Sequence, residues 1–206
     1  MKVLLINGSP HEKGCTYTAL SLIAGELKAQ GIETEILHVG GQPVGGCIGC
    51  SGCRSGNGCV FGGVVNEAIE KAKTADAFVF GSPVHYASAA GNMASFMDRL
   101  AYAGGKYLAY KPAAVCCSAR RAGTTSTLDQ LVKYPQFFHM PLVNSSYWAM
   151  VHGSNPEQVL QDAEGCAVMQ ELGRNMAWLL HCIEAGKAAG IDHPQNPPRP
   201  MTNFIR

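Results

Sequence analysis

The sequence predicts an α/β fold in which a parallel sheet is covered by helices on both faces. Strand-like and helix-like segments alternate five times along its 206 residues. The expected strands are short and mostly apolar, as in sheets buried on both sides. Loops rich in Gly, Ser, Thr or Pro follow three of them, at 8–16, 81–88 and 117–125. Ligands of such sheets bind beyond the carboxyl ends of the strands, so these loops are expected to share one crevice.

The first half of the chain opens with an apolar run, Val3 to Ile6, that stops at Asn-Gly-Ser-Pro and predicts a buried strand. Residues 16–30 place apolar side chains on one helical face, and Gly31 ends that helix. The other elements expected in this half are a strand at 33–39, a helix at 64–73, a strand at 77–80 and a turn at 81–83.

In the second half, residues 89–102 predict a helix because Met93, Phe96, Met97 and Leu100 recur at core spacing. The remaining expected elements are a strand at 113–117, a short helix at 126–133, a fifth strand at 141–143 that continues toward Trp148, and a long helix at about 156–186. Residues 1–190 are therefore expected to form one domain, followed by a proline-rich tail at 191–206.

Bulk charge excludes two classes of partner. The formal net charge is +1 and the isoelectric point is near 7.6, so neither nucleic acid nor a membrane surface is indicated. The apolar run after Lys2 is too short for the core of a signal peptide. No stretch reaches the ~18 uninterrupted apolar residues of a membrane span. We therefore expect a cytoplasmic protein, where disulfides rarely persist.

The loop at 8–16 has the features of an anion site. Ser9 and Thr16 supply hydroxyls, Gly14 keeps the backbone open, and a helix starts there with unpaired N–H groups. The lysine of the common nucleotide-phosphate loop is missing, and so is the Gly-x-Gly-x-x-Gly fingerprint of dinucleotide sites. The loop thus favours a monophosphate ester, although a strand-to-helix turn that binds nothing has the same features.

Residues 40–63 carry ten glycines and four cysteines and show no periodicity, with an insertion expected at 43–63. Cys47, Cys50, Cys53 and Cys59 follow the spacing C-x2-C-x2-C-x5-C. This compact run favours a 4Fe–4S cluster over structural zinc, which more often uses two separated pairs. Zinc and unliganded thiols remain the alternatives. The other five cysteines are expected to be buried packing residues: Cys15, Cys116, Cys117, Cys166 and Cys182.

Several other polar or aromatic residues are assigned structural roles. Asp98 and Arg99 are expected to form an ion pair or a cap, and Trp148 and Trp178 to lie in the core or an interface. His38, His139, His152 and His181 lack ligand-spaced partners.

Three ordered motifs carry a family resemblance. They are Asn7-Gly8-Ser9-Pro10 with Gly14-Cys15-Thr16, then Gly81-Ser82-Pro83-Val84-His85-Tyr86, and Phe96-Met97-Asp98-Arg99. Together they resemble the NAD(P)H-dependent FMN reductases and iron–sulfur flavoproteins of the flavodoxin-like superfamily. The resemblance implies a flavodoxin-like three-layer sandwich with a five-stranded parallel sheet and FMN as cofactor.

The resemblance also implies the residues that hold FMN. The phosphate would lie against Ser9, Pro10, Cys15, Thr16 and Tyr17; the isoalloxazine ring against Ser82, Pro83, Val84, His85 and Tyr86; and its pyrimidine edge against Ser118, Arg121, Gly123 and Thr124. Two positions depart from the usual pattern, because Cys15 stands where asparagine is frequent and His85 where an aromatic residue is frequent. The second departure puts the stacking partner of the ring in question.

An oxidoreductase is the function that this resemblance implies. Electrons would come from NAD(P)H or a ferredoxin-like donor and pass to a quinone, a nitro or azo compound, or a protein, and flavin chemistry needs no protein acid or base. A pure electron carrier and a cysteine-based redox or metal sensor are the alternatives. The resemblance further implies a homodimer or homotetramer, with Phe204 and Ile205 of the tail lying against a neighbouring subunit.

Overall fold

A twisted parallel sheet forms the centre of the protein in the computed structural model, which describes residues 1–198, 200 and 202. Its five parallel strands lie in the order β2-β1-β3-β5-β6, and a sixth, short strand, β4, pairs antiparallel with β3. The strands are β1 (Lys2–Asn7), β2 (Glu33–His38), β3 (Ala77–His85), β4 (Ser88–Ala89), β5 (Ala113–Ala119) and β6 (Met150–His152). The predicted α/β fold is therefore confirmed.

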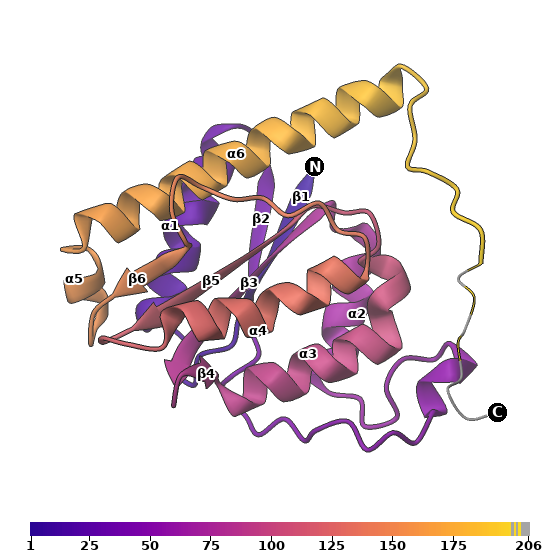
Figure 1. The fold of residues 1–206 in the computed structure, drawn as a ribbon, viewed down its shortest axis with the longest axis horizontal. Coiled ribbons are helices and arrows are strands. Elements are labelled where there is room, and N and C mark those ends of the chain that lie inside the picture. The colour runs from indigo at the N-terminus through magenta and orange to yellow at the C-terminus, as the bar shows by residue number, and fades with distance from the viewer. Residues whose placement is uncertain (199, 201, 203–206) are drawn as a thin grey trace.

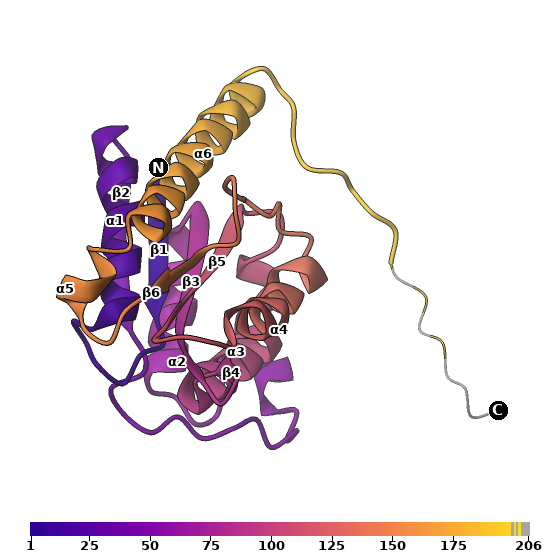
Figure 2. The same cartoon turned by 60° about the vertical axis from the view of Figure 1, so that its left-hand side comes forward.

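Helices cover both faces of this sheet (Figures 1 and 2). One face packs against α1 (Cys15–Ala29), α5 (Pro156–Val159) and α6 (Ala163–Ala188), and the other against α2 (Val64–Thr74), α3 (Gly91–Gly104) and α4 (Thr124–Phe137). Two short 3-10 turns, η1 (Gly52–Ser55) and η2 (Gly105–Tyr107), lie in the connections.

Strand β1 shows why the expected strands are so apolar. Val3 and Leu5 point into the core shared with α1 and α6, whereas Leu4 and Ile6 point into the core on the opposite face. All four are at most 1% exposed. Because side chains alternate along a strand and both faces are covered, the four central positions of β1, Val3 to Ile6, are all apolar.

The order of the strands places the crevice. From β1 the chain goes first to β2 on one side and then to β3 on the other, so the direction of winding reverses at β1. A crevice opens at such a reversal, beyond the carboxyl ends of the two diverging strands. The loop after Asn7 and the distal part of β3 therefore lie where a ligand is expected.

Strand β3 is longer than the sequence predicts. The expected turn at 81–83 is instead strand, because Gly81 to Pro83 pair with Cys116 to Ser118 of β5. The strand continues to His85 and turns back into β4, pairing Val84 with Ala89. The predicted turn is wrong because proline does not break a strand at this place: the pairing of β3 with β1 ends at Gly81, so no strand on that side needs an N–H from Pro83.

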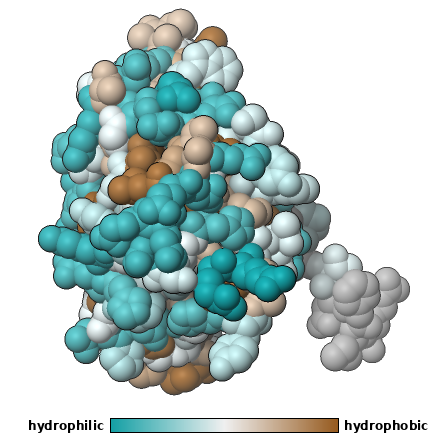
Figure 3. Space-filling view, turned by 90° about the vertical axis from the view of Figure 1, so that its left-hand side faces the viewer, coloured by the Kyte–Doolittle hydropathy of each residue, from teal (hydrophilic) through white to brown (hydrophobic). Residues whose placement is uncertain are grey.

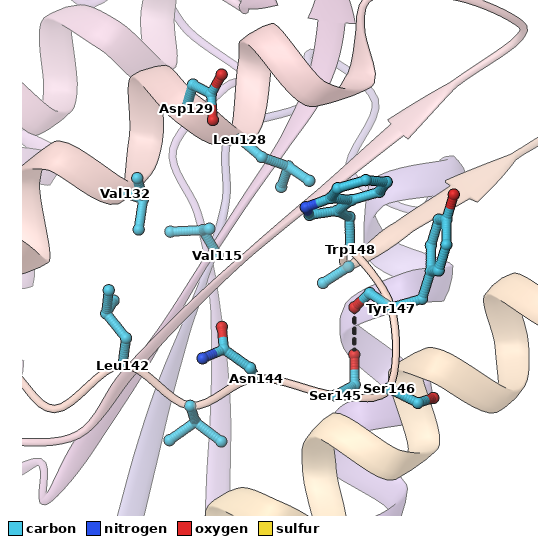
Figure 4. A pocket seen from close by; sticks show the side chains of 12 residues that line it. Val115, Leu128, Asp129, Val132, Leu142, Asn144, Ser145, Ser146, Tyr147 and Trp148 are labelled. Atoms are coloured by element: carbon cyan, nitrogen blue, oxygen red, sulfur yellow. Dashed lines mark hydrogen bonds between the residues drawn. The ribbon is translucent and has the colours of Figure 1, made fainter.

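The fifth strand also lies later than predicted. Residues 141–143 make only an isolated bridge, between Leu142 and Ala113. The chain then leaves β5 and returns as β6, whose three residues pair with Cys117 to Ala119. Between α4 and the departing segment 142–149 lies a hollow of about 420 Å³, into which Trp148 and Leu128 project (Figure 4).

The predicted helix at 156–186 is divided in two. Asp162 interrupts it, because its side chain accepts the N–H of Gly165 and caps the start of α6. The tail beyond α6 leads away from the body of the molecule (Figure 2), yet His193 stacks on Tyr110 with ring centroids 4.3 Å apart. The expected contacts of Phe204 and Ile205 lie outside the described residues.

Candidate functional site

The start of α1 presents free backbone donors at the crevice. Gly14 is its N-cap and supplies no side-chain bond. Within the described part of the chain, the N–H groups of Cys15, Thr16 and Tyr17 have no acceptor. These donors and the positive end of the helix dipole fit an anion such as a phosphate ester.

The hydroxyls around this loop are engaged within the protein. Ser9 accepts the N–H of His11 at 3.1 Å. Thr16 and Ser118 share a hydrogen bond of 2.8 Å, and both residues are almost fully buried. Because the Ser9 hydroxyl accepts the bond from His11 and does not donate it, an anion at the start of α1 would be held by the backbone N–H groups together with the O–H of Ser9.

The β3–β4 hairpin forms a second wall of the crevice. Its two turn residues, Tyr86 and Ala87, both have positive φ, at 50° and 59°. Two-residue hairpins of this geometry normally use Asn-Gly, because a Cβ is disfavoured in the left-handed region. The Tyr86 side chain is fully exposed. An aromatic ring is thus held in solvent on a strained turn, a combination that often marks ligand sites.

The loop after β5 closes onto this hairpin. Gly123 has φ of +93°, and a Cβ there would lie 2.6 Å from the Cα of Ala87. The Ser126 hydroxyl donates to the carbonyl of Ala87 at 2.7 Å. Glycine is thus required at 123 both for its conformation and for the close approach. Figure 3, which views the molecule from the left-hand side of Figure 1, shows a mostly hydrophilic surface with small separate apolar patches.

The predicted FMN residues are brought to one end of the sheet, with different orientations. Arg121, His85 and Pro10 are exposed, and Thr124 is buried. Ser82 is fully buried; its hydroxyl donates to the carbonyl of Pro83 and accepts the N–H of Ala90. The side chain of Ser82 therefore supports the hairpin from within.

The cysteine-rich loop lies apart from this crevice, against α2 and α3. Cys47, Cys50, Cys53 and Cys59 all line one hollow of about 390 Å³. Among the described residues, no three His, Cys, Asp or Glu side chains converge closely enough to hold a metal ion. The four thiols thus surround one common space, but in the described structure their sulfur atoms do not come together at a single point.

Three side chains that the sequence did not single out as site residues hold this loop. Asn66 accepts the N–H of Cys59 and donates to its carbonyl. Asn92 donates to the carbonyls of Gly40 and Gln42. Arg99 donates from Nε to the Cys59 sulfur at 3.2 Å. The sequence carries one sign of this role for Arg99: it lies three residues after Phe96, beside the core-facing stripe of α3.

Two more sequence predictions are corrected here. Asp98 and Arg99 form no ion pair with each other; Asp98 accepts the hydroxyl of Tyr134 instead. Cys182, near the end of α6, is exposed, and Cys15 and Cys166, in the first turns of α1 and α6, are half-buried. Only Cys116 and Cys117 are buried as predicted, and burial raises the pKa of the Cys117 thiol to about 12.

A sequence model of NADPH-dependent FMN reductases matches residues 1–155, three-quarters of the chain. The chain belongs to the NADPH-dependent FMN reductase family. This membership makes it a flavin oxidoreductase and confirms the resemblance drawn from the three motifs.

Among curated relatives, an iron–sulfur flavoprotein of Methanocaldococcus jannaschii is 27% identical to this FMN reductase family member, over 89% of the chain and 100% of the relative. An iron–sulfur flavoprotein of Archaeoglobus fulgidus is 36% identical over 48% of each chain. Among solved structures, a flavone reductase superposes with a TM-score of 0.67 at 18% identity, covering 89% of this chain and 64% of that one. A flavodoxin from the domain Archaea superposes with a TM-score of 0.60 at 14% identity, covering 88% of this chain and 99% of that one, which confirms the flavodoxin-like fold. No helix in the described residues is both long and apolar enough to span a bilayer.

Proposed function

We propose that this protein is an FMN-dependent oxidoreductase with a 4Fe–4S cluster that relays single electrons. The donor is NAD(P)H or a ferredoxin-like protein, and the acceptor is a quinone, a nitro or azo compound, or another protein. The observation that carries the proposal is the gathering of four cysteines around one hollow, in a chain of the FMN reductase family. Iron–sulfur clusters are held by four cysteine thiolates of this kind.

For FMN, the proposed phosphate site is the start of α1. The free N–H groups of Cys15, Thr16 and Tyr17 fit it, with Ser9 and Pro10 shaping the approach. The proposed wall for the flavin ring is the segment from Ser82 to Tyr86, of which Tyr86 offers an aromatic face. The proposed partners of the pyrimidine edge are Ser118, Arg121, Gly123 and Thr124, with the Arg121 charge placed to stabilise an anionic reduced ring.

Bound FMN would supply both two-electron and one-electron chemistry, which allows exchange between a hydride donor and a one-electron cluster. The protein groups at the crevice bind and orient; none of them is required to carry a proton. This division fits the buried, hydrogen-bonded states of Thr16 and Ser118.

The test is the cofactor content of anaerobically prepared protein. We expect FMN, iron and acid-labile sulfide in the wild type, and loss of iron and sulfide with retention of FMN in Cys53→Ala. Cys182→Ala is the matched control, because Cys182 is exposed on α6, outside the hollow. Zinc in place of iron would support a metal sensor instead. Slow NAD(P)H oxidation with fast exchange with reduced ferredoxin would support a pure electron carrier.

We further propose that residues 1–190 form one FMN-binding domain with the cysteine-rich insertion at 43–63, and that the tail at 191–206 is a subunit-contact arm of a homodimer or homotetramer in the cytoplasm. The stack of His193 on Tyr110 supports a defined course for the first part of the tail. Sedimentation of the protein truncated after residue 190 tests the arm. A dimer or tetramer that survives truncation would contradict it.

A further inference from the structure

Arg99 is a buried cation beside the cysteine hollow. It lies on α3, near the end of the apolar stripe formed by Phe96, Met97 and Leu100, and only 6% of it is exposed. Arginine is almost never this buried unless its charge is paired. The partners of its guanidinium therefore decide what the residue does.

Among the described residues, every polar partner of Arg99 belongs to the cysteine-rich loop. Its Nη1 donates to the carbonyl of Gly45 at 3.4 Å, before the first cysteine, and Nη2 donates to the carbonyl of Gly62 at 3.0 Å, after the last. Its Nε donates to the sulfur of Cys59 at 3.2 Å. The guanidinium also lies over the ring of Phe61, 5.4 Å from the centroid. One side chain thus joins both ends of the loop and contacts a cysteine sulfur.

These partners leave the charge of Arg99 without an opposite charge. In the described part of the chain, Arg99 takes part in none of the ion pairs. The side chains that line the hollow include a second cation, Arg54, and no carboxylate. A buried charge that lacks a counter-charge is costly, and neutral carbonyls compensate it only in part. The hollow is therefore built for an anion.

We propose that Arg99 is the counter-charge of the iron–sulfur cluster and that its N–H bond to Cys59 raises the reduction potential of that cluster. The proposal rests on the function proposed above. A cubane cluster held by four thiolates is an anion in both oxidation states, and reduction adds one electron to its iron and sulfide core. Positive charge and hydrogen bonds to a ligand sulfur stabilise the more negative, reduced state more strongly. Arg99 is thus a positioning and tuning residue.

The alternative is that Arg99 only fastens the loop to α3. Two substitutions separate the roles. Arg99→Lys keeps the positive charge and loses the planar fork, whereas Arg99→Gln keeps an N–H donor and loses the charge. Arg54→Gln is the matched control, because Arg54 lines the same hollow but is exposed, so water screens its charge.

The measurement is a redox titration of the reconstituted full-length protein with soluble mediators, followed by the electron paramagnetic resonance of the reduced cluster. In Arg99→Gln we expect about a tenfold lower ratio of reduced to oxidised cluster at a fixed potential, a shift of about 59 mV to more negative values for one electron. We expect Arg99→Lys and Arg54→Gln to shift the reduction potential of the cluster much less.

A potential in Arg99→Gln equal to that of the wild type would overturn the proposal. If Arg99→Gln fails to load a cluster, Arg99→Lys decides: loading at a near-normal potential supports the counter-charge, and failure to load shows a fastening role alone and overturns it. Wild-type protein that takes up no iron and sulfide refutes the proposed cluster itself, an outcome distinct from an unchanged potential in a loaded variant.

Discussion

The side-chain oxygens of Thr16 and Ser118 lie 2.8 Å apart, although 102 positions separate them in the chain. Thr16 belongs to the first turn of α1, and Ser118 to the end of β5. Both are buried, at 1% and 3% exposure. Their hydrogen bond therefore fixes the distance between two of the three loops that border the crevice.

This bond leads to a prediction about stability. Thr16→Val and Ser118→Ala each leave one buried hydroxyl without its partner, which costs about 1–3 kcal/mol of the free energy of unfolding. The double variant removes both hydroxyls, so its loss is expected to be clearly smaller than the sum of the single losses. Urea unfolding of the four proteins of this cycle measures the coupling. The control is Thr125→Val, at an exposed threonine in the first turn of α4, which is expected to change the free energy of unfolding by less than about 0.5 kcal/mol. Additive losses would contradict the bond.

The strained hairpin predicts opposite effects on stability and on FMN binding. In Tyr86→Gly the positive φ is no longer disfavoured, and the lost ring is fully exposed in the protein without ligand. We expect the free energy of unfolding of the FMN-free protein to rise by roughly 0.5–1 kcal/mol, after subtracting the entropy that glycine adds to the unfolded state. Affinity for FMN is expected to fall about fivefold, since stacking of an aromatic pair is worth ~1 kcal/mol.

Ala87→Gly is the control for the hairpin, because it relieves a similar strain and keeps the ring. Calorimetric titration of FMN into each apoprotein measures the affinity. Equal affinities for Tyr86→Gly and Ala87→Gly would show that the Tyr86 ring makes no contact with the flavin.

Much of this fold could be predicted because its signals are local. The run from Val3 to Ile6 is apolar at every position, and only a strand covered on both faces requires that. The predicted element bounds between residues 141 and 162 were wrong for the opposite reason. The position of β6 depends on where β5 still has a free edge, at Cys117 to Ala119. The break before α6 depends on a single capping residue, Asp162. Both depend on tertiary contacts that periodicity does not encode.

The site divides in a similar way. The loop at Gly8 to Thr16 could be located because its glycine and hydroxyl residues follow a strand directly. The supports of the cysteine loop, Asn66 and Arg99, were not identified as site residues, since each lies on a helix of ordinary composition and reaches the loop only after folding. Sequence spacing gathers the four thiols but does not indicate what balances their charge.

A network of charges on the sheet predicts a dependence of stability on pH. Glu35 on β2 accepts hydrogen bonds from Lys2 at 2.8 Å and from Lys71 at 2.6 Å. These bonds, that from Lys2 foremost, hold the pKa of Glu35 below its ordinary value of 4.5. Because the folded state binds the proton less readily than the unfolded state, this contribution is present above pH 4.5 and is lost as the pH falls through the lower folded pKa.

Glu35→Gln is therefore expected to destabilise the protein at pH 7 by less than about 1 kcal/mol, since water partly screens these pairs. The difference from the wild type is expected to vanish below the folded pKa of Glu35. Urea unfolding at a series of pH values measures it. Glu70→Gln removes a more exposed pair, with Lys73, and is expected to have a smaller effect. A constant difference from pH 7 down to pH 3 would rule out the linkage to Glu35.

The attachment of Cys59 predicts a specific loss of cluster loading. Asn66 on α2 holds the backbone of Cys59 at both its N–H, at 2.8 Å, and its carbonyl, at 3.0 Å. Asn66→Ala removes both bonds, so the fourth cysteine is no longer fixed relative to the helices. We expect iron and sulfide content after reconstitution to fall several-fold while FMN content stays unchanged, because Asn66 lies on the side of the sheet away from α1.

Asn57→Ala, at an exposed asparagine of the same loop, is the control and is expected to load normally. Equal loading of the two variants would mean that the thiols find their ligand geometry without support from α2.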